Sequence, residues 1–250
     1  MRSVWLIFQR EFQAYWTSPV AYVVLAMFLI LSGFFFFGEF SRFVDFSQRG
    51  GSGVDVNQML IRPYFYTVSV MILFLLPLVT MRLFAEERRQ GTLEVLLTTP
   101  ATEFSLVLGK FFAALGLFAV MMLGSVVHIG LLFIFGSPDL APVLTGFLGL
   151  FLTGAVYIAI GVLLSSLTQN QVVAAAISFS LFLALWLFYW IGGLTSGSLS
   201  KVLLYTSLAG HFENFGRGVL SSSDFVFYLS WIVAGLFGAT QVVQSTRWKA

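Results

Sequence analysis

The chain has 250 residues, of which 58% are hydrophobic and only 10% are charged, and its formal net charge is +2. Soluble domains carry roughly 25% charged residues, so this composition does not supply a water-exposed surface, and the excess apolar surface must face lipid. The small net charge does not indicate nucleic acid as a partner. The lack of cysteine excludes disulfides and thiolate metal sites, and the two distant histidines do not favour a metal site.

The first segment with a clear pattern covers residues 4–16, VWLIFQREFQAYW. Aromatic side chains recur there at helical spacing, while Arg2, Gln9 and Gln13 lie on another face. This pattern predicts an amphipathic helix that lies on the inner membrane interface and contacts membrane lipids. The predicted interfacial anchors are Trp5, Phe8, Phe12 and Trp16.

Uncharged stretches of at least about 18 residues are long enough to cross a hydrocarbon core of about 30 Å. Residues 140–200 carry no charge. As one helix they would be about 90 Å long, so the polar cluster at residues 165–171 is expected to turn the chain back. These stretches lack the period-two alternation of a β-barrel. The sequence therefore predicts an all-α membrane protein, one transmembrane domain over residues 1–250, with spans at about residues 20–38, 64–81, 106–135, 141–164, 172–194 and 225–243.

The distribution of positive charge predicts the orientation. With the N-terminus inside, eight of the 13 lysine and arginine residues lie on the cytoplasmic side, so both termini are expected there. Residues 39–63, with glycines at 50, 51 and 53, are then expected to form a mobile outer loop. Residues 195–224 form a second outer segment. Its pattern predicts a helix that lies on the outer surface or dips into the membrane, with an apolar face of Leu208, Phe212, Phe215 and Val219.

Several residues inside the predicted spans have structural interpretations. Lys110, near the inner end of the third span, is expected to reach the membrane surface as a snorkelling anchor. His128 is expected to hydrogen-bond to a neighbouring side chain, and Pro77 to kink the second span. Four glycines are expected to allow close helix packing, and they are candidates for a dimer seam: Gly146, Gly149, Gly154 and Gly161.

The most charged segment is MRLFAEERRQGTLEVLLTTPAT, residues 81–102. Residues 82–90 are expected to extend the second span as a helix that Gly91 ends in a left-handed conformation. Thr92 then caps a short helix through Leu97, with leucines on one face and charges on the other. By itself this pattern fits either an interfacial turn or a docking element for a cytoplasmic partner. The phosphate-binding loop motif is absent from the sequence, so ATP hydrolysis by that route is excluded.

The stretch Glu87–Pro100, Glu-Arg-Arg-x-Gly-Thr-Leu-Glu-x-Leu-Leu-x-Thr-Pro, resembles the signature of ABC-2-type transporter permeases. It falls between the second and third spans, where that family carries it. Residues 10–36 and 211–230 resemble the corresponding segments of the gliding-motility-associated branch. The resemblance implies six spans, an interfacial N-terminal helix, and a cytoplasmic coupling helix at residues 91–97. It also implies that the permease pairs with a second or homologous copy and resides, multi-pass, in the bacterial inner membrane.

The resemblance further implies a separate cytoplasmic ATPase subunit that binds ATP and Mg, so this chain is expected to be no enzyme and to hold no cofactor. We expect a permease subunit that exports a hydrophobic or amphiphilic cargo. The alternatives are a mechanotransmission subunit, which moves a periplasmic or membrane accessory protein without transport, and an ATP-independent channel or scaffold. The residues expected to couple to the ATPase are Glu86, Glu87, Arg88, Arg89, Gly91, Thr92, Leu93, Glu94, Leu96 and Leu97.

The predicted topology can be tested by cysteine scanning, because the natural chain has no cysteine. Gln90→Cys should react with a membrane-impermeant reagent only from the cytoplasm, whereas Ser52→Cys and Ser198→Cys should react only from outside. Labelling of position 90 from outside would contradict the predicted orientation.

Overall fold

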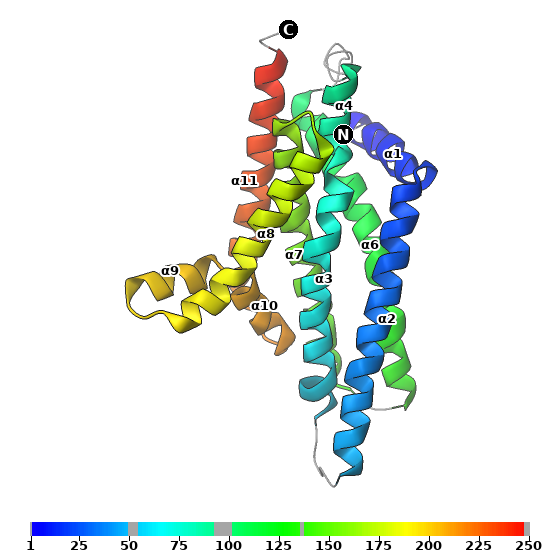
Figure 1. The fold of residues 1–250 in the computed structure, drawn as a ribbon, viewed down its shortest axis with the longest axis vertical. Coiled ribbons are helices and arrows are strands. Elements are labelled where there is room, and N and C mark those ends of the chain that lie inside the picture. The colour runs from blue at the N-terminus through cyan, green and yellow to red at the C-terminus, as the bar shows by residue number, and fades with distance from the viewer. Residues whose placement is uncertain (1, 50–54, 93–101, 136–137, 248–250) are drawn as a thin grey trace.

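A computed structural model describes residues 2–49, 55–92, 102–135 and 138–247. These residues form helices, most of which run along one long axis, and no strand occurs within these ranges (Figure 1). The helices are α1 (Arg2–Thr17), α2 (Pro19–Gln48), the short π-helical turn η1 (Asn57–Ile61), α3 (Arg62–Thr80), α4 (Arg82–Gln90), α6 (Glu103–Phe135), α7 (Leu140–Leu167), α8 (Gln171–Leu194), α9 (Ser198–Thr206), α10 (Leu208–Gly216) and α11 (Ser222–Arg247).

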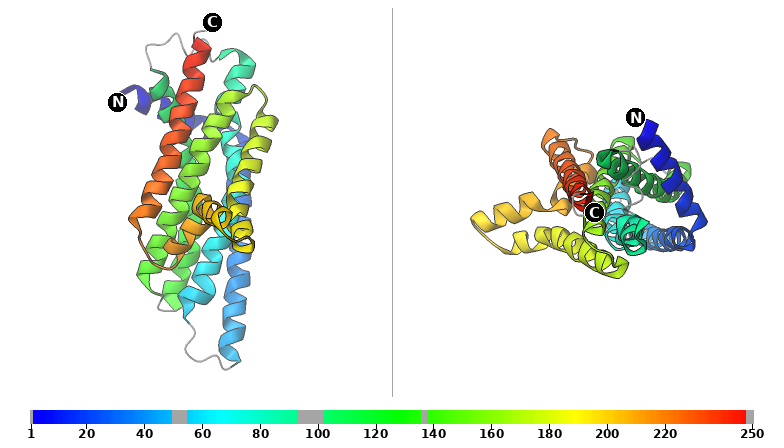
Figure 2. Two further views of the ribbon diagram at one scale, coloured as in Figure 1. Left: turned by 90° about the vertical axis from the view of Figure 1, so that its left-hand side faces the viewer. Right: turned by 90° about the horizontal axis from the view of Figure 1, so that it is seen from above.

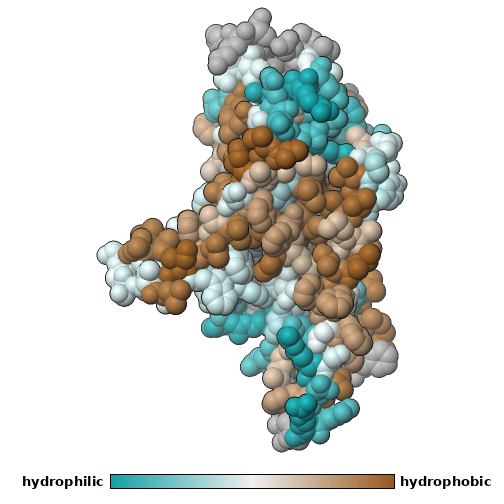
Figure 3. Space-filling model, viewed as in Figure 1, coloured by the Kyte–Doolittle hydropathy of each residue, from teal (hydrophilic) through white to brown (hydrophobic). Residues whose placement is uncertain are grey.

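Six helical stretches in the described ranges are long and apolar enough to cross a membrane. They correspond to α2, to the continuous run from η1 through α4, and to α6, α7, α8 and α11. The prediction of an all-α membrane protein with six spans is therefore confirmed. Figure 3 shows a surface that is largely apolar along the middle of the molecule, with polar side chains gathered toward its two ends.

The turn between the fourth and fifth spans is set by Asn170. Its side-chain Oδ1 accepts from the backbone N–H of Val172 at 2.9 Å and of Val173 at 3.4 Å, which caps the start of α8. Such a cap satisfies N–H groups that have no partner within the helix. α7 continues through the two serines of the polar cluster to Leu167, so the break lies at residues 168–170, within the predicted segment.

The segment predicted as an outer loop is largely helical. α2 continues from the apolar span to Gln48, and η1 begins at Asn57. The prediction ended the span where charges begin, but charge does not end a helix that has left the hydrocarbon. Arg42 pairs with Glu39 at 3.1 Å, one helical turn away, which suits a helix. The glycines at 50, 51 and 53 lie outside the described residues.

α7 lies at the centre of the bundle and contacts α3, α6, α8, α10 and α11. Its glycines make this possible, because a Cβ at Gly154 would lie 2.1 Å from the ring of Phe118 in α6. The other three glycines face Phe65, Phe215 and Thr80 of neighbouring helices at similarly short range. The predicted close packing is confirmed. The suggestion of a dimer seam is wrong, because this chain's own helices cover these positions.

α1 lies across one end of the bundle, nearly perpendicular to the spans (Figures 1 and 2). It packs against α6, where Gly109 and Gly116 lie directly beneath Ile7 and Phe12. The predicted anchors form a row of ring contacts along α1, with centroids 5.1 Å apart for Trp5 and Phe8, 5.5 Å for Phe8 and Phe12, and 5.9 Å for Phe12 and Trp16. Trp5 is 58% exposed, whereas the other three are partly buried. Their role as lipid anchors stays a prediction.

α9, with the adjoining ends of α8 and α10, forms an arm that projects from the side of the bundle opposite α1 (Figure 2). α10 returns from this arm to contact α7 and α8, with Leu208, Phe212 and Phe215 buried. The sequence allowed a helix on the outer surface or one that dips inward, and the packing of α10 against α7 fits the second arrangement better. Val219, by contrast, follows the helix and is exposed. His211 Nδ1 lies 2.6 Å from Asp224 Oδ1, which ties α10 to the first turn of α11.

The predicted neighbour of His128 is Tyr64, whose hydroxyl lies 3.0 Å from His128 Nδ1. The imidazole also stacks on Phe36, with ring centroids 5.3 Å apart. These contacts join α2, α3 and α6, so the structural interpretation of His128 is confirmed.

The packing of α7 predicts opposite effects for two glycine substitutions. Gly154→Ala should lower thermal stability in detergent, because overpacking typically costs about 1–3 kcal/mol. Gly130→Ala in α6 is the matched control, because no atom of the described residues lies within 4 Å of its Cβ position, and alanine is favoured over glycine inside a helix by roughly 0.5–1 kcal/mol. Equal melting temperatures for the two variants would contradict the central position of α7.

Candidate functional site

The joint between α3 and α4 is held by one serine of α7. Ser165 Oγ accepts from the backbone N–H groups of Phe84 at 3.0 Å and Ala85 at 3.1 Å, and donates to the carbonyl of Met81 at 2.9 Å. A hydroxyl has one donor and two acceptor positions, so this buried group is fully used. The start of α4 is therefore fixed to the central helix.

α4 is also held at its far end. Arg88 donates to Thr246 Oγ1 of α11 at 2.7 Å, and Leu83, Phe84 and Ala85 are buried against the bundle. The helix ends at Gly91, whose φ of 70° is the left-handed conformation that the sequence predicted. Because α4 is short and fixed along its length, it forms a rigid extension of the second span that ends at Gly91.

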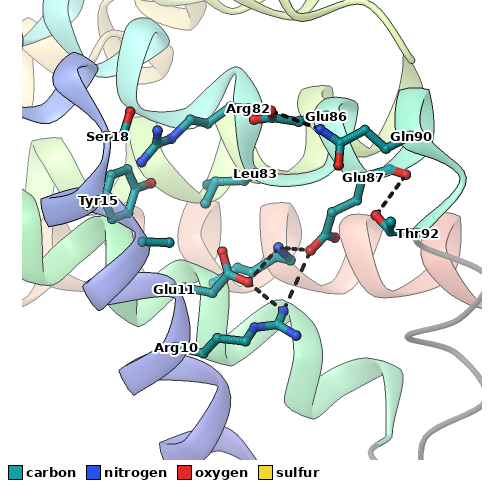
Figure 4. Close-up of a pocket in the computed structure, with 12 residues that line it drawn as sticks. Arg10, Glu11, Tyr15, Ser18, Arg82, Leu83, Glu86, Glu87, Gln90 and Thr92 are labelled. Carbon is teal, nitrogen blue, oxygen red and sulfur yellow. Dashed lines mark hydrogen bonds and ion pairs between the residues drawn. The ribbon is translucent and has the colours of Figure 1, made fainter.

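A cluster of four charged side chains joins α1, α4 and α6. Lys110 Nζ of α6 lies 2.8 Å from Glu87 Oε1 of α4 and 3.1 Å from Glu11 Oε1 of α1. Arg10 contacts the same two carboxylates, at 2.6 Å for Glu11 and 3.6 Å for Glu87. Figure 4 shows Arg10, Glu11 and Glu87 pointing toward one another at the junction of their helices.

The position of Lys110 corrects the sequence-based interpretation. Its side chain is only 1% exposed, and its ammonium lies 5.1 Å from the ring centroid of Phe84, so it is no snorkelling lipid anchor. Snorkelling was expected because water was the only stabilising environment evident near the third span. In the folded chain, Glu11 and Glu87 supply two carboxylates instead, and a buried charge requires such partners.

Electrostatics in the cluster favour the ionised form of Glu11. Burial alone would raise the pKa of this carboxyl group, but the nearby Lys110 ammonium and Arg10 guanidinium outweigh burial and hold the pKa below its usual value. The cluster forms one wall of a cavity of about 800 Å³, which opens between α1 and α4. Arg82 lies on another side of this cavity, 4.4 Å from the ring centroid of Tyr15. Within the described ranges, no group of acidic and histidine side chains is arranged to hold a metal ion.

The structure places only part of the predicted coupling set at this site. Glu87 belongs to the cluster, whereas Glu86 faces the cavity and accepts from Gln90 at 3.2 Å. Arg89 is exposed, and Thr92 Oγ1 lies 3.4 Å from the Glu87 carbonyl. The remaining predicted residues lie outside the described residues: Leu93, Glu94, Leu96 and Leu97.

Sequence reasoning missed Glu11 as a site residue. The signal was present, because Glu11 lies four residues from both Ile7 and Tyr15 and so shares the apolar face of its helix. A carboxylate on an apolar face and a lysine inside an apolar stretch together indicate a buried ion pair. The sequence does not show which helices meet, and that information was needed to pair them.

This fold and site define a class of protein: a helical membrane protein with six spans, in which a charged helix continues from the second span and is fixed to the bundle. The chain belongs to the family described as ABC-2 family transporter protein, whose family model matches residues 5–246. Members of this family are membrane subunits that work with a separate ATPase subunit. No curated protein matches the chain. The gliding-motility branch stays a prediction.

The charge cluster predicts a large effect for Lys110→Met. This change leaves two carboxylates facing each other with only the half-exposed Arg10, and breaking a buried pair costs about 3–5 kcal/mol. Chemical unfolding in detergent measures the loss. Lys201→Met is the matched control, because Lys201 is exposed. Adding Glu87→Gln to Lys110→Met should restore part of the stability, and wild-type stability of Lys110→Met would contradict the buried pair.

Proposed function

We propose that this chain is the membrane subunit of an ATP-driven exporter. ATP is hydrolysed by a separate cytoplasmic subunit, and a hydrophobic or amphiphilic cargo moves outward between two permease copies in a bacterial inner membrane. The observation that carries this proposal is the attachment of α4. This helix is bonded to α1 and α6 through the charge cluster, to α7 through Ser165, and to α11 through Arg88.

The proposed mechanism is mechanical. The ATPase docks on residues 91–97, where the leucines enter a groove and the flanking charges fix the orientation. When the ATPase subunits close on ATP, they pull on this element. Because α4 is fixed along its length, the load passes to the second span and to α1 and α6 rather than bending the connection. These helices then tilt and open the path toward the outside.

We infer the cargo class from the residues of the spans. Proton and ion relays within membranes use ionisable side chains, and such groups are sparse in the apolar middle of the six spans. A path lined by apolar and aromatic side chains suits a hydrophobic or amphiphilic molecule. The second candidate is a mechanotransmission subunit that passes the ATPase stroke to a periplasmic partner without transport, and the experiment below separates the two.

Different substitutions should affect docking of the ATPase and transmission of force through α4. Leu96→Ala and Glu94→Arg should weaken association with the ATPase, by about tenfold for each 1.4 kcal/mol lost. Ser165→Ala should leave association unchanged but lower the transport achieved per ATP hydrolysed, because the α3–α4 joint loses its bonds. Arg247→Ala is the control for docking. Ser180→Ala is the control for the joint, because Ser180 is exposed and donates to the Ala176 carbonyl of its own helix.

The measurements are co-purification of the ATPase in mild detergent, and ATP hydrolysis with amphiphile movement in proteoliposomes. If both docking variants associate with the ATPase as tightly as the wild type does, residues 91–97 are only an interfacial turn. Hydrolysis stimulated by the chain, without movement of any amphiphile, would favour mechanotransmission. Lack of any co-purifying ATPase would favour a channel or scaffold.

A further inference from the structure

A second group of charged residues lies far from the charge cluster, where α3, α8 and α10 meet. Glu213 of α10 receives two guanidinium groups on the same oxygen, Oε1: Arg62 of α3 and Arg217 each lie 2.5 Å away. Its other oxygen accepts from the hydroxyl of Tyr189 in α8 at 2.6 Å. Among the described residues, neither arginine pairs with another carboxylate. The group therefore carries one positive charge that nothing in this part of the chain balances.

Three of these residues, Arg62, Tyr189 and Glu213, line a pocket of about 370 Å³, within the range of small-molecule sites. Its walls are aromatic, formed by Tyr66, Tyr189, Trp190 and Phe212, and its polar groups include Arg62 and Gln58. Trp190 is 55% exposed and donates its indole N–H to the Tyr66 hydroxyl at 3.3 Å. The pocket thus combines an apolar wall that reaches the protein surface with a polar end that is rich in donors.

The donors exceed the acceptors at that polar end. Arg62 has five N–H donors, and the only acceptor bonded to it in the described structure is Glu213. The Tyr66 hydroxyl accepts from Trp190, which leaves its own proton to donate. Arg62, Tyr189 and Arg217 all donate to the Glu213 carboxylate, which therefore needs no further donor. A ligand that accepts hydrogen bonds and carries negative charge complements this surplus, whereas a cation does not.

We propose that this pocket binds the phosphate headgroup of an anionic amphiphile, a phospholipid-like molecule whose acyl chains lie along the aromatic wall. Arginine is suited to phosphate because its planar fork presents parallel donors. Tyrosine and tryptophan are enriched where membrane headgroups meet the hydrocarbon. The site lies on the half of the bundle away from α1 and α4 (Figure 1). It holds this ligand whether or not the ligand is the exported cargo.

Two variants distinguish the proposed anionic ligand from a cationic ligand and from a purely structural salt bridge. Arg62→Gln removes the main phosphate donor, so the lipid should bind about tenfold or more weakly. Glu213→Gln removes the competing negative charge, so the same lipid should bind several-fold more tightly. A cation site would lose affinity with Glu213→Gln. A structural bridge that only shapes the pocket would lose affinity with both changes.

Native mass spectrometry of the full chain in detergent measures the binding, with dioctanoyl phosphatidylglycerol as the probe. Inorganic phosphate and dioctanoylglycerol supply the headgroup chemistry and the chains separately. Arg42→Gln is the matched control, because Arg42 is an exposed arginine whose one carboxylate partner among the described residues is Glu39. Tyr66→Phe and Arg62→Lys provide milder changes, and each should weaken binding less than Arg62→Gln.

We expect phosphatidylglycerol to bind at least tenfold more tightly than either separate component, with opposite shifts for Arg62→Gln and Glu213→Gln. Three results would overturn the proposal. These are absence of specific lipid binding, equal binding of inorganic phosphate and the lipid, and equal weakening by the two variants.

Discussion

The close contact of α7 with its neighbours is the constraint on which the rest of the bundle depends. Helices approach this closely only where one of them lacks a side chain, and α7 supplies such positions toward α3, α6 and α10. In lipid, helices gain little from hiding apolar surface from one another, so tight van der Waals contact must hold them together. The same helix carries Ser165, so the core of the bundle and the joint of α4 share one element.

The charge cluster adds a different kind of connection. Apolar contacts have no preferred direction, whereas the Lys110 ammonium pairs with two carboxylates in defined positions. α1 and α4 thereby hold a defined register relative to α6. The segment that follows Gly91 is connected to most of the bundle through these contacts, which suits a subunit whose family works with a separate ATPase. The phosphate-binding pocket proposed on the opposite half lies against α3 and α8, so both halves share the second span.

Much of the fold could be predicted from the sequence because membrane spans are set by length and hydropathy alone. The spans, the turn before Asn170 and the left-handed Gly91 all follow from local rules. The errors arose where the answer depended on which helices meet. Lys110 was assigned to the membrane surface because its partners are about 99 residues before and 23 residues before it in the chain. The glycines of α7 were correctly linked to close packing, but their neighbours lie in distant segments. The pairing of Arg62 with Glu213, 151 residues apart, was equally invisible.

The burial of Lys110 has a consequence for how the polypeptide is assembled during synthesis. α1 is made first, but its carboxylate has no buried partner until the third span enters the membrane about a hundred residues later. Conversely, Lys110 entering lipid before α1 and α4 are in place would carry an unbalanced charge into a medium that strongly disfavours it. α1 must therefore remain at the membrane surface until α6 is inserted. An amphipathic helix is suited to this intermediate, because it is stable at the interface without any protein neighbour.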